Sequence, residues 1–226
     1  MRHFLWDGPY RQEAIAPVVN KLGHFLSNPI LRSIVGQKTN RVDLRRIIDH
    51  EQVLIANLSK GRIGEDASNL LGSLLVASLQ LAAMGRADIP EEQRRDCFLY
   101  VDEFQNFATD SFATILSEAR KYRLSLTIAN QYLEQIEENV LAAVFGNVGS
   151  LLSFQVGPRD AEALVEQFGG YVSTRDMIHL PKYHAYVRML IDGGSTPPFS
   201  MTTLPPYRRS LRVRAPTVTP TVFTAR

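Results

Sequence analysis

The sequence predicts an α/β fold in which a mainly parallel sheet is flanked by helices. Residues 53–58 and 97–102 form short, nearly continuous apolar runs, which are typical of strands buried on both faces. Between such runs, apolar side chains recur at the three- and four-residue spacing of amphipathic helices. Strands that alternate with helices indicate a layered fold around a parallel sheet.

The elements are expected in alternating order along the chain. The strands cover residues 53–58, 97–102, 125–130, 150–156 and 184–191. The helices cover residues 12–26, 66–79, 112–119, 136–145 and 160–168. Thr109 or Asp110 is expected to cap the helix at 112–119, because both side chains accept hydrogen bonds from helix N-terminal amides. After Ile191 the glycines and prolines indicate irregular structure.

Length and composition fit one folded domain followed by a basic tail. The chain has 226 residues, is 45% hydrophobic and contains one cysteine, Cys97, which excludes an internal disulfide. We expect residues 1–206 to fold and residues 207–226, rich in Thr, Pro and Arg, to be a disordered segment or a docking arm. The tail holds five arginines and no acid, so removing its charge from the net +2 leaves −3 on residues 1–206. This balance argues against a self-sufficient DNA-binding domain.

Neither a membrane span nor a targeting segment is expected. The longest apolar stretch, residues 70–84, falls short of the ~20 residues that a spanning helix needs. Residues 1–10 have no apolar run of signal-peptide length. The five histidines lack the spacing of metal ligands, so a structural zinc site is not expected.

A pair of carboxylates follows the apolar run at 97–101. Asp102 and Glu103 stand where that strand is expected to end, and open α/β sheets bind ligands at the carboxyl ends of their strands. There Asp102 would hold Mg²⁺, directly or through water, and Glu103 would orient and polarise an attacking water. This is the Walker B pattern of nucleotide hydrolases. The alternative is a solvated strand end without a ligand.

Two further polar residues belong to the same constellation. Gln131 ends the next expected strand, where its amide would sense a γ-phosphate; its alternative role is that of an ordinary turn residue. Arg120 lies at the end of the intervening helix. It either complements the negative end of that helix or acts as an arginine finger on a neighbouring subunit's nucleotide, and Lys121 and Arg123 compete for the second role.

The phosphate-binding loop that would complete such a site is absent from the sequence. Residues 36–39, Gly-Gln-Lys-Thr, only resemble the required Gly-x-x-x-x-Gly-Lys-[Ser/Thr]. Gln37 separates the glycine from the lysine, and Leu31 stands where the first glycine belongs. The loop needs both glycines so that its backbone amides can wrap the phosphates. No Walker A loop is therefore predicted in this chain.

The order of these motifs resembles the coupling ATPases of type IV secretion, the TraG/TraD-like conjugative DNA-transfer proteins of the HerA/FtsK superfamily. The resemblance covers roughly residues 10–206. It is carried by residues 98–107, 116–122, 129–132, 146–149, 156–161, 180–186 and 198–200.

The resemblance implies a RecA-like motor domain that assembles into a hexameric ring and uses ATP with Mg²⁺. Its cargo would be DNA, with single-stranded DNA expected, and its partners a relaxase and type IV secretion components at the cytoplasmic face of the inner membrane. By position, Asp102 and Glu103 would be the Walker B pair, with Asp102 holding the Mg²⁺. Arg120 would be the trans-acting finger. Gln131 would contact the nucleotide and couple hydrolysis to movement.

The missing loop leaves three interpretations open. The chain is a fragment of a longer protein, or a separate polypeptide supplies the loop, or the ATPase is inactive; the fragment is the favoured interpretation. Two other functions compete with that of a DNA-translocating motor. One is a non-catalytic module that docks on secretion machinery or DNA, and the other is a motor whose cargo is protein.

Overall fold

The computed structural model describes residue 23 and residues 27–205. Its helices are α2 (Pro29–Val35), α3 (Leu44–Asp49), α4 (Lys60–Ile63), α5 (Glu65–Met84), α6 (Asp110–Glu118), α7 (Glu138–Asn147), α8 (Pro158–Gln167) and α9 (Thr174–Ile178). Its strands are β1 (Cys97–Val101), β2 (Leu124–Ile128), β3 (Leu151–Ser153), β4 (His184–Arg188), β5 (Leu190–Ile191), β6 (Gly194–Ser195) and β7 (Phe199–Thr202). The 3-10 turns are η1 (Gly85–Asp88), η2 (Glu91–Gln93), η3 (Phe104–Asn106), η4 (Ala119–Tyr122) and η5 (Leu133–Gln135).

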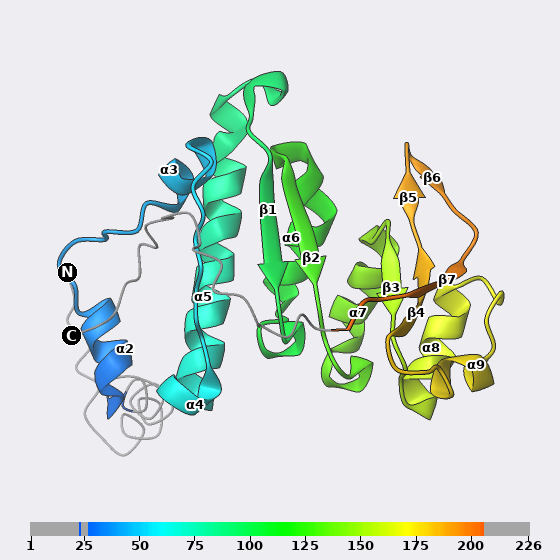
Figure 1. Cartoon of the computed structure of the whole chain (residues 1–226). Helices are drawn as coiled ribbons and strands as arrows, with labels where there is room; N and C mark the ends of the chain where they lie inside the picture. Colours follow the sequence, from blue (N-terminus) through cyan, green and yellow to red (C-terminus); the bar gives the residue numbers. More distant parts are fainter. Residues whose placement is uncertain (1–22, 24–26, 206–226) are drawn as a thin grey trace, which may run out of the picture.

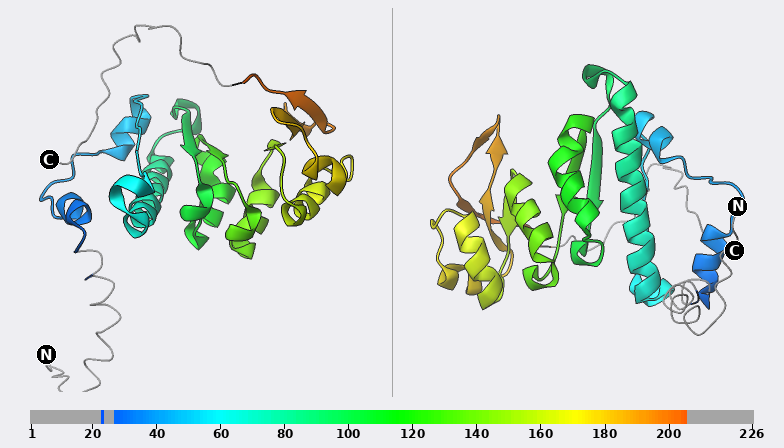
Figure 2. Two further views of the ribbon diagram at one scale, coloured as in Figure 1. Left: turned by 60° about the horizontal axis from the view of Figure 1, so that its bottom comes forward. Right: turned by 180° about the vertical axis from the view of Figure 1, so that it is seen from behind.

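Strands β1 and β2 form a parallel pair near the middle of the described chain (Figure 1). The register pairs Cys97 with Leu124 and Val101 with Ile128, so the two strands end together at one edge. Parallel neighbours need a crossover connection, and α6 provides it. This helix lies behind the two strands in Figure 1. In the right-hand view of Figure 2, which is turned by 180°, it lies in front of them. The predicted α/β class and its parallel pairing are confirmed.

The remaining strands pair differently from the mainly parallel arrangement that the sequence predicts. β3, β4 and β7 form an antiparallel sheet in the order β3-β4-β7, and β5 pairs with β6 as a hairpin. The apolar run at 184–191 is divided between β4 and β5. In β4 only Ala185 and Val187 are buried, and this alternation is typical of an antiparallel strand with one covered face. Strands β6 and β7 also order a region predicted to be irregular.

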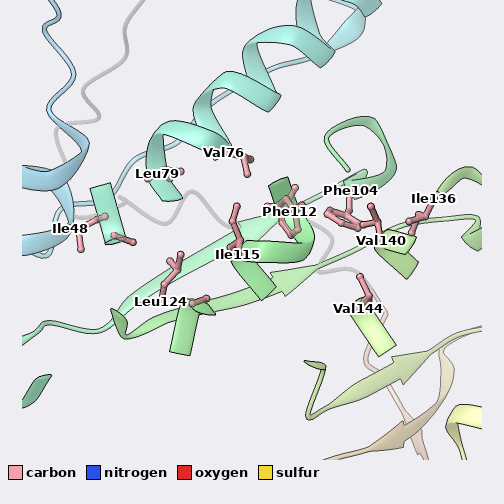
Figure 3. Close-up of a cluster of buried hydrophobic side chains, with 13 residues drawn as sticks. Ile48, Val76, Leu79, Phe104, Phe112, Ile115, Leu124, Ile136, Val140 and Val144 are labelled. Carbon is pink, nitrogen blue, oxygen red and sulfur yellow. The ribbon is translucent and has the colours of Figure 1, made fainter. Parts of the chain in front are cut away.

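The main hydrophobic core fills the space between α5, α6, α7 and one face of β1 and β2 (Figure 3). At its centre Phe104 and Phe112 are fully buried, with ring centroids 4.5 Å apart in an edge-on arrangement. Such aromatic pairs stabilise a core beyond the area that they bury. A second, smaller core lies under α8 and α9 and includes Phe168 and Met177. The core therefore supports the strand ends from one side of the sheet only.

The predicted strand at 53–58 is wrong. This segment is extended chain without strand pairing, and the side chains of Val53 and Ile55 are 80% and 81% exposed. Leu54 and Leu58 are partly buried and line the clefts beside β1. A continuous apolar run predicts burial on both faces, but among the described residues no strand is bonded to this run and one of its faces is uncovered.

The helices predicted at 66–79, 112–119, 136–145 and 160–168 are confirmed as α5 to α8. Thr109 is the N-cap residue of α6, but its side chain makes no capping hydrogen bond. The predicted helix at 12–26 falls on residues of which only Gly23 is described, and the tail at 207–226 lies outside the described residues.

One helix in the described ranges, residues 65–88, is long and apolar enough to cross a membrane by length and composition alone. Core helices of soluble proteins meet the same criterion. Within α5, the buried side chains include Val76, Leu79 and Ala83, which belong to the main core. Other apolar side chains of α5, such as Leu74 and Leu81, are exposed, so only one face of the helix packs on the core.

Candidate functional site

The candidate site begins where β1 ends, at Asp102 and Glu103. The Oδ1 atom of Asp102 accepts a hydrogen bond from the backbone N–H of Glu103 at 3.0 Å. Glu103 has φ 52° and ψ 46°, which is the left-handed region. A residue with a Cβ pays about 1–2 kcal/mol for that conformation. This conformation sets the direction in which the Glu103 side chain leaves the end of the strand.

The strained turn aims the Glu103 carboxylate at its neighbours. Its Oε1 accepts a hydrogen bond from Nε2 of Gln131, and its Oε2 accepts one from Nε2 of Gln105 at 2.5 Å. Gln131 follows β2, whose register with β1 brings the two strand ends together. Backbone bonds close the arrangement: Phe104 N–H donates to Ala129 O at 2.9 Å. The structure thus brings Asp102, Glu103 and Gln131 to one edge of the sheet.

The turn that follows Glu103 is anchored on two sides. Phe104 is fully buried against Phe112, and Phe107 packs on α5 where Gly72 leaves room for its ring. A Cβ added at Gly72 would stand 2.1 Å from Cε1 of Phe107. The orientation of Glu103 therefore depends on contacts with both α6 and α5.

These side chains border a cleft of about 920 Å³ between residues 54–60, α5 and the carboxyl end of β1. Leu75, Val76 and Leu79 of α5 form part of its apolar lining. Its polar groups include Asp102, Glu103, Asn106 and Gln131, together with Lys60 and Glu65. The cleft thus combines an apolar wall from α5 with a polar edge at the end of β1.

Lys60 is a functional candidate that the sequence reasoning missed. Its Nζ donates to Asn106 Oδ1 at 2.8 Å and to Glu65 Oε1 at 2.6 Å. The hydrogen bond from Lys60 is the main reason that the pKa of the Glu65 carboxyl is lowered. The available signal was that Lys60 follows the apolar run at 53–58, much as Asp102 follows that at 97–101.

Arg120 lies away from this cleft. It is exposed on η4, which leads directly into the amino end of β2, whereas Glu103 and Gln131 follow the carboxyl ends of the strands. The turn is held from outside: Arg94 Nη1 donates to Lys121 O, and the Arg94 guanidinium stands 5.5 Å from the ring centroid of Tyr122. Arg120 is therefore not brought to its own chain's candidate site, and a role on a neighbouring subunit stays a prediction.

The residues present fit a magnesium ion bound together with a polyphosphate. Within residues 27–205 no three His, Cys, Asp or Glu side chains gather as a ready-made cluster of metal ligands. Mg²⁺ in nucleotide sites needs no such cluster, since one or two carboxylates, waters and substrate phosphates complete its shell. Asp102 is exposed at the strand end, so its carboxylate can serve as that ligand.

Comparison with known protein families finds one that matches the part of the chain containing these residues. Residues 96–177 match the family described as the TraM recognition site of TraD and TraG. This part of the chain is TraG/TraD-like. The matched span contains Asp102, Glu103, Arg120 and Gln131. The resemblance inferred from the motifs is confirmed.

One solved structure shares the fold, and another is more distantly similar. The bacterial conjugative coupling protein TrwBdeltaN70 is 19% identical and matches with a TM-score of 0.58 over 88% of this chain and 51% of its own. This chain thus spans about half the length of that protein. The genome packaging NTPase B204 from Sulfolobus turreted icosahedral virus 2, bound to ATP-gammaS, is 14% identical with a TM-score of 0.44 over 70% of this chain and 71% of its own. A search of curated protein sequences found no match.

Proposed function

We propose that this chain is the hydrolysis half of an ATP-driven motor that moves DNA in conjugative transfer. The observation that carries the proposal is Glu103, held in a left-handed conformation at the end of a parallel strand with its carboxylate bonded to Gln131. A carboxylate fixed in this way suits the polarisation of a water molecule, and an amide beside it suits contact with the phosphate that the water attacks.

The proposed reaction uses the residues in separate roles. Glu103 takes a proton from water as the water oxygen bonds to the γ-phosphorus and the bond to the β–γ bridging oxygen breaks. Asp102 would hold Mg²⁺, and the ion would supply charge neutralisation for the phosphates. Gln131 is hydrogen-bonded to Glu103, and its contact with the γ-phosphate changes when that phosphate leaves. Arg120 acts on the nucleotide of the next subunit in a hexameric ring.

The face of the sheet opposite α6 supports the interpretation that this chain is part of a larger motor. Phe98 and Tyr100 of β1 point away from the core and are 64% and 72% exposed. Parallel strands are normally covered on both faces. We propose that the segment carrying the phosphate loop packs on this face in a longer protein. The coupling protein that matches this chain is about twice its length. Relaxase and secretion partners at the inner membrane follow from the same proposal.

The test is ATP hydrolysis by the 226-residue chain and by a form extended upstream through its reading frame, each with and without single-stranded DNA. We expect activity only in the extended form. There Glu103→Gln should lower kcat by about 10²–10⁴-fold while ATP binding persists, because only water activation is lost. Glu162→Gln, an exposed carboxylate on α8, is the matched control and should leave turnover unchanged. If turnover is unchanged in Glu103→Gln, Glu103 is not the residue that activates water.

A second candidate function is favoured by the family description itself. A TraM recognition site binds a protein partner, so we propose as the alternative that residues 96–177 dock a TraM-like protein without catalysis. Partner binding that survives Glu103→Gln, together with no hydrolysis in either form of the protein, would favour this docking module over the motor.

A further inference from the structure

Lys60 has an unusual position among the cations of the described chain. It is the only Lys or Arg that lines the cleft beside Asp102, Glu103 and Gln131 within residues 27–205. Its ammonium group has three N–H donors, and Glu65 and Asn106 each accept a hydrogen bond from it. With its side chain 41% exposed, Lys60 can be reached by a ligand in the cleft.

The contacts of Lys60 join the two sides of the cleft. Glu65 begins α5 on the same side as Lys60, whereas Asn106 ends the η3 turn that starts directly after Glu103. From the first residue of α4, the lysine thus reaches the turn that positions the Glu103 carboxylate. A salt bridge on the surface would not need this second contact, and surface pairs of this kind add little to stability.

Release of Lys60 from Glu65 is inexpensive because of where Glu65 stands. Glu65 is in the first turn of the 20-residue helix α5, where the positive end of the helix dipole stabilises a carboxylate. The helix dipole continues to stabilise the Glu65 carboxylate after the lysine has moved away. Asn106 likewise borders the open cleft, so water can replace the lysine at its amide oxygen.

We propose that Lys60 is a phosphate-binding residue of the cleft and exchanges Glu65 and Asn106 for oxygens of a polyphosphate. The nucleotide as the natural source of that polyphosphate rests on the proposed function. Asp102, Glu103 and the proposed γ-phosphate all carry negative charge. An ammonium group that lines the same cleft supplies a cation for the phosphate oxygens, which the carboxylates cannot bind without a metal ion.

The first test observes the lysine directly in the 226-residue chain. Its lysines carry ¹³C by biosynthetic labelling, which leaves all three N–H donors in place, and the Lys60→Arg variant assigns the Lys60 Cε signal. On titration with inorganic tripolyphosphate and Mg²⁺, the Lys60 signal should shift, while that of Lys182, which stacks on Tyr183 outside the cleft, should not. A static Lys60 signal, or equal shifts of both lysines, overturns the proposal.

The second test measures affinity with a matched control on the same segment. Lys60→Met should weaken tripolyphosphate binding by about tenfold, the usual loss for one hydrogen bond to a charged group. Arg62→Met removes an exposed cation two residues away that does not line the cleft, and it should bind as the wild type does. Urea unfolding of both variants should coincide with the wild type. Equal weakening by the two changes overturns the proposal.

The extended protein separates this inference from the proposed function. One outcome is that the extended Lys60→Met protein hydrolyses ATP with an unchanged KM and the Lys60 signal does not shift. The proposed motor function is then retained, and Lys60 is not part of its site. The opposite outcome is that the Lys60 signal shifts with tripolyphosphate but the extended protein does not hydrolyse ATP. Lys60 then binds phosphate, and the proposed motor function is wrong.

Discussion

Arg86 shows at the scale of one residue how a buried cation holds the ends of several elements together. Its side chain is fully buried, Nη1 donates to Tyr122 O at 2.9 Å, Nη2 donates to Arg95 O, and Nε stands 3.3 Å from Asp49 Oδ1. Burial lowers the pKa of the guanidinium, and the Asp49 charge opposes that effect. Because Tyr122 ends η4, this network also fixes the turn that presents Arg120.

Replacement of Arg86 by leucine should therefore destabilise the chain strongly. The carbonyl oxygens of Tyr122 and Arg95 lose their donor, while Asp49 keeps Arg45 as a partner. We expect the change to lower the unfolding free energy by about 3 kcal/mol. Urea denaturation followed by circular dichroism measures the change. Arg62→Leu, at an exposed position, is the comparison and should stay within about 0.5 kcal/mol of the wild type. A similarly small effect at Arg86 would show that the network is not needed.

Single residues of the site were predictable where chain order alone decides their place. Asp102, Glu103 and Gln131 each follow an apolar run, and parallel strands bring such positions to one edge. Lys60 and Arg86 were not predictable, because their partners Asn106 and Tyr122 lie 46 and 36 residues away in sequence. Periodicity contains no information about contacts of that separation.

At the scale of elements, the contact between α5 and the turn after Glu103 depends on the absence of a side chain. Gly72→Ala would improve helix propensity by up to ~1 kcal/mol, but its Cβ would overlap the Phe107 ring. We expect a net loss of about 1–3 kcal/mol of unfolding free energy, since the anchored ring must move. Gly146→Ala in α7 meets nothing within 4 Å and should instead stabilise the chain. Urea unfolding of the two variants compares them, and equal stability would contradict the proposed packing.

The elements themselves were largely predictable from periodicity, with one instructive failure. Helices α5 to α8 bury an apolar stripe, which the spacing of leucines and other apolar residues records. The run at 53–58 reads as a strand by composition, yet a strand also needs a bonded neighbour. Among the described residues it has none, so Val53 and Ile55 remain exposed.

At the scale of the whole molecule, the exposed face of β1 is the place where the proposed phosphate-loop segment would pack. Phe98 points away from the core, whereas its neighbour Leu99 points into it. If the proposed phosphate-loop segment covers this face, Phe98 changes from an exposed to a buried side chain and Leu99 does not. The two residues therefore respond differently to the same extension of the chain.

Phe98→Ala should change the unfolding free energy of the 226-residue chain by no more than about 0.5 kcal/mol, as is usual for exposed positions. In the extended protein the same change should cost about 3–5 kcal/mol, because a cavity then forms in a covered core. Leu99→Ala should destabilise both forms, which checks that each form reports on core packing. The measurement is denaturant unfolding of the chain and of the extended protein, each with both variants. An equally small effect of Phe98→Ala in the two forms would mean that the extension leaves this face uncovered, and the phosphate loop would then have to approach Glu103 from another side of the sheet.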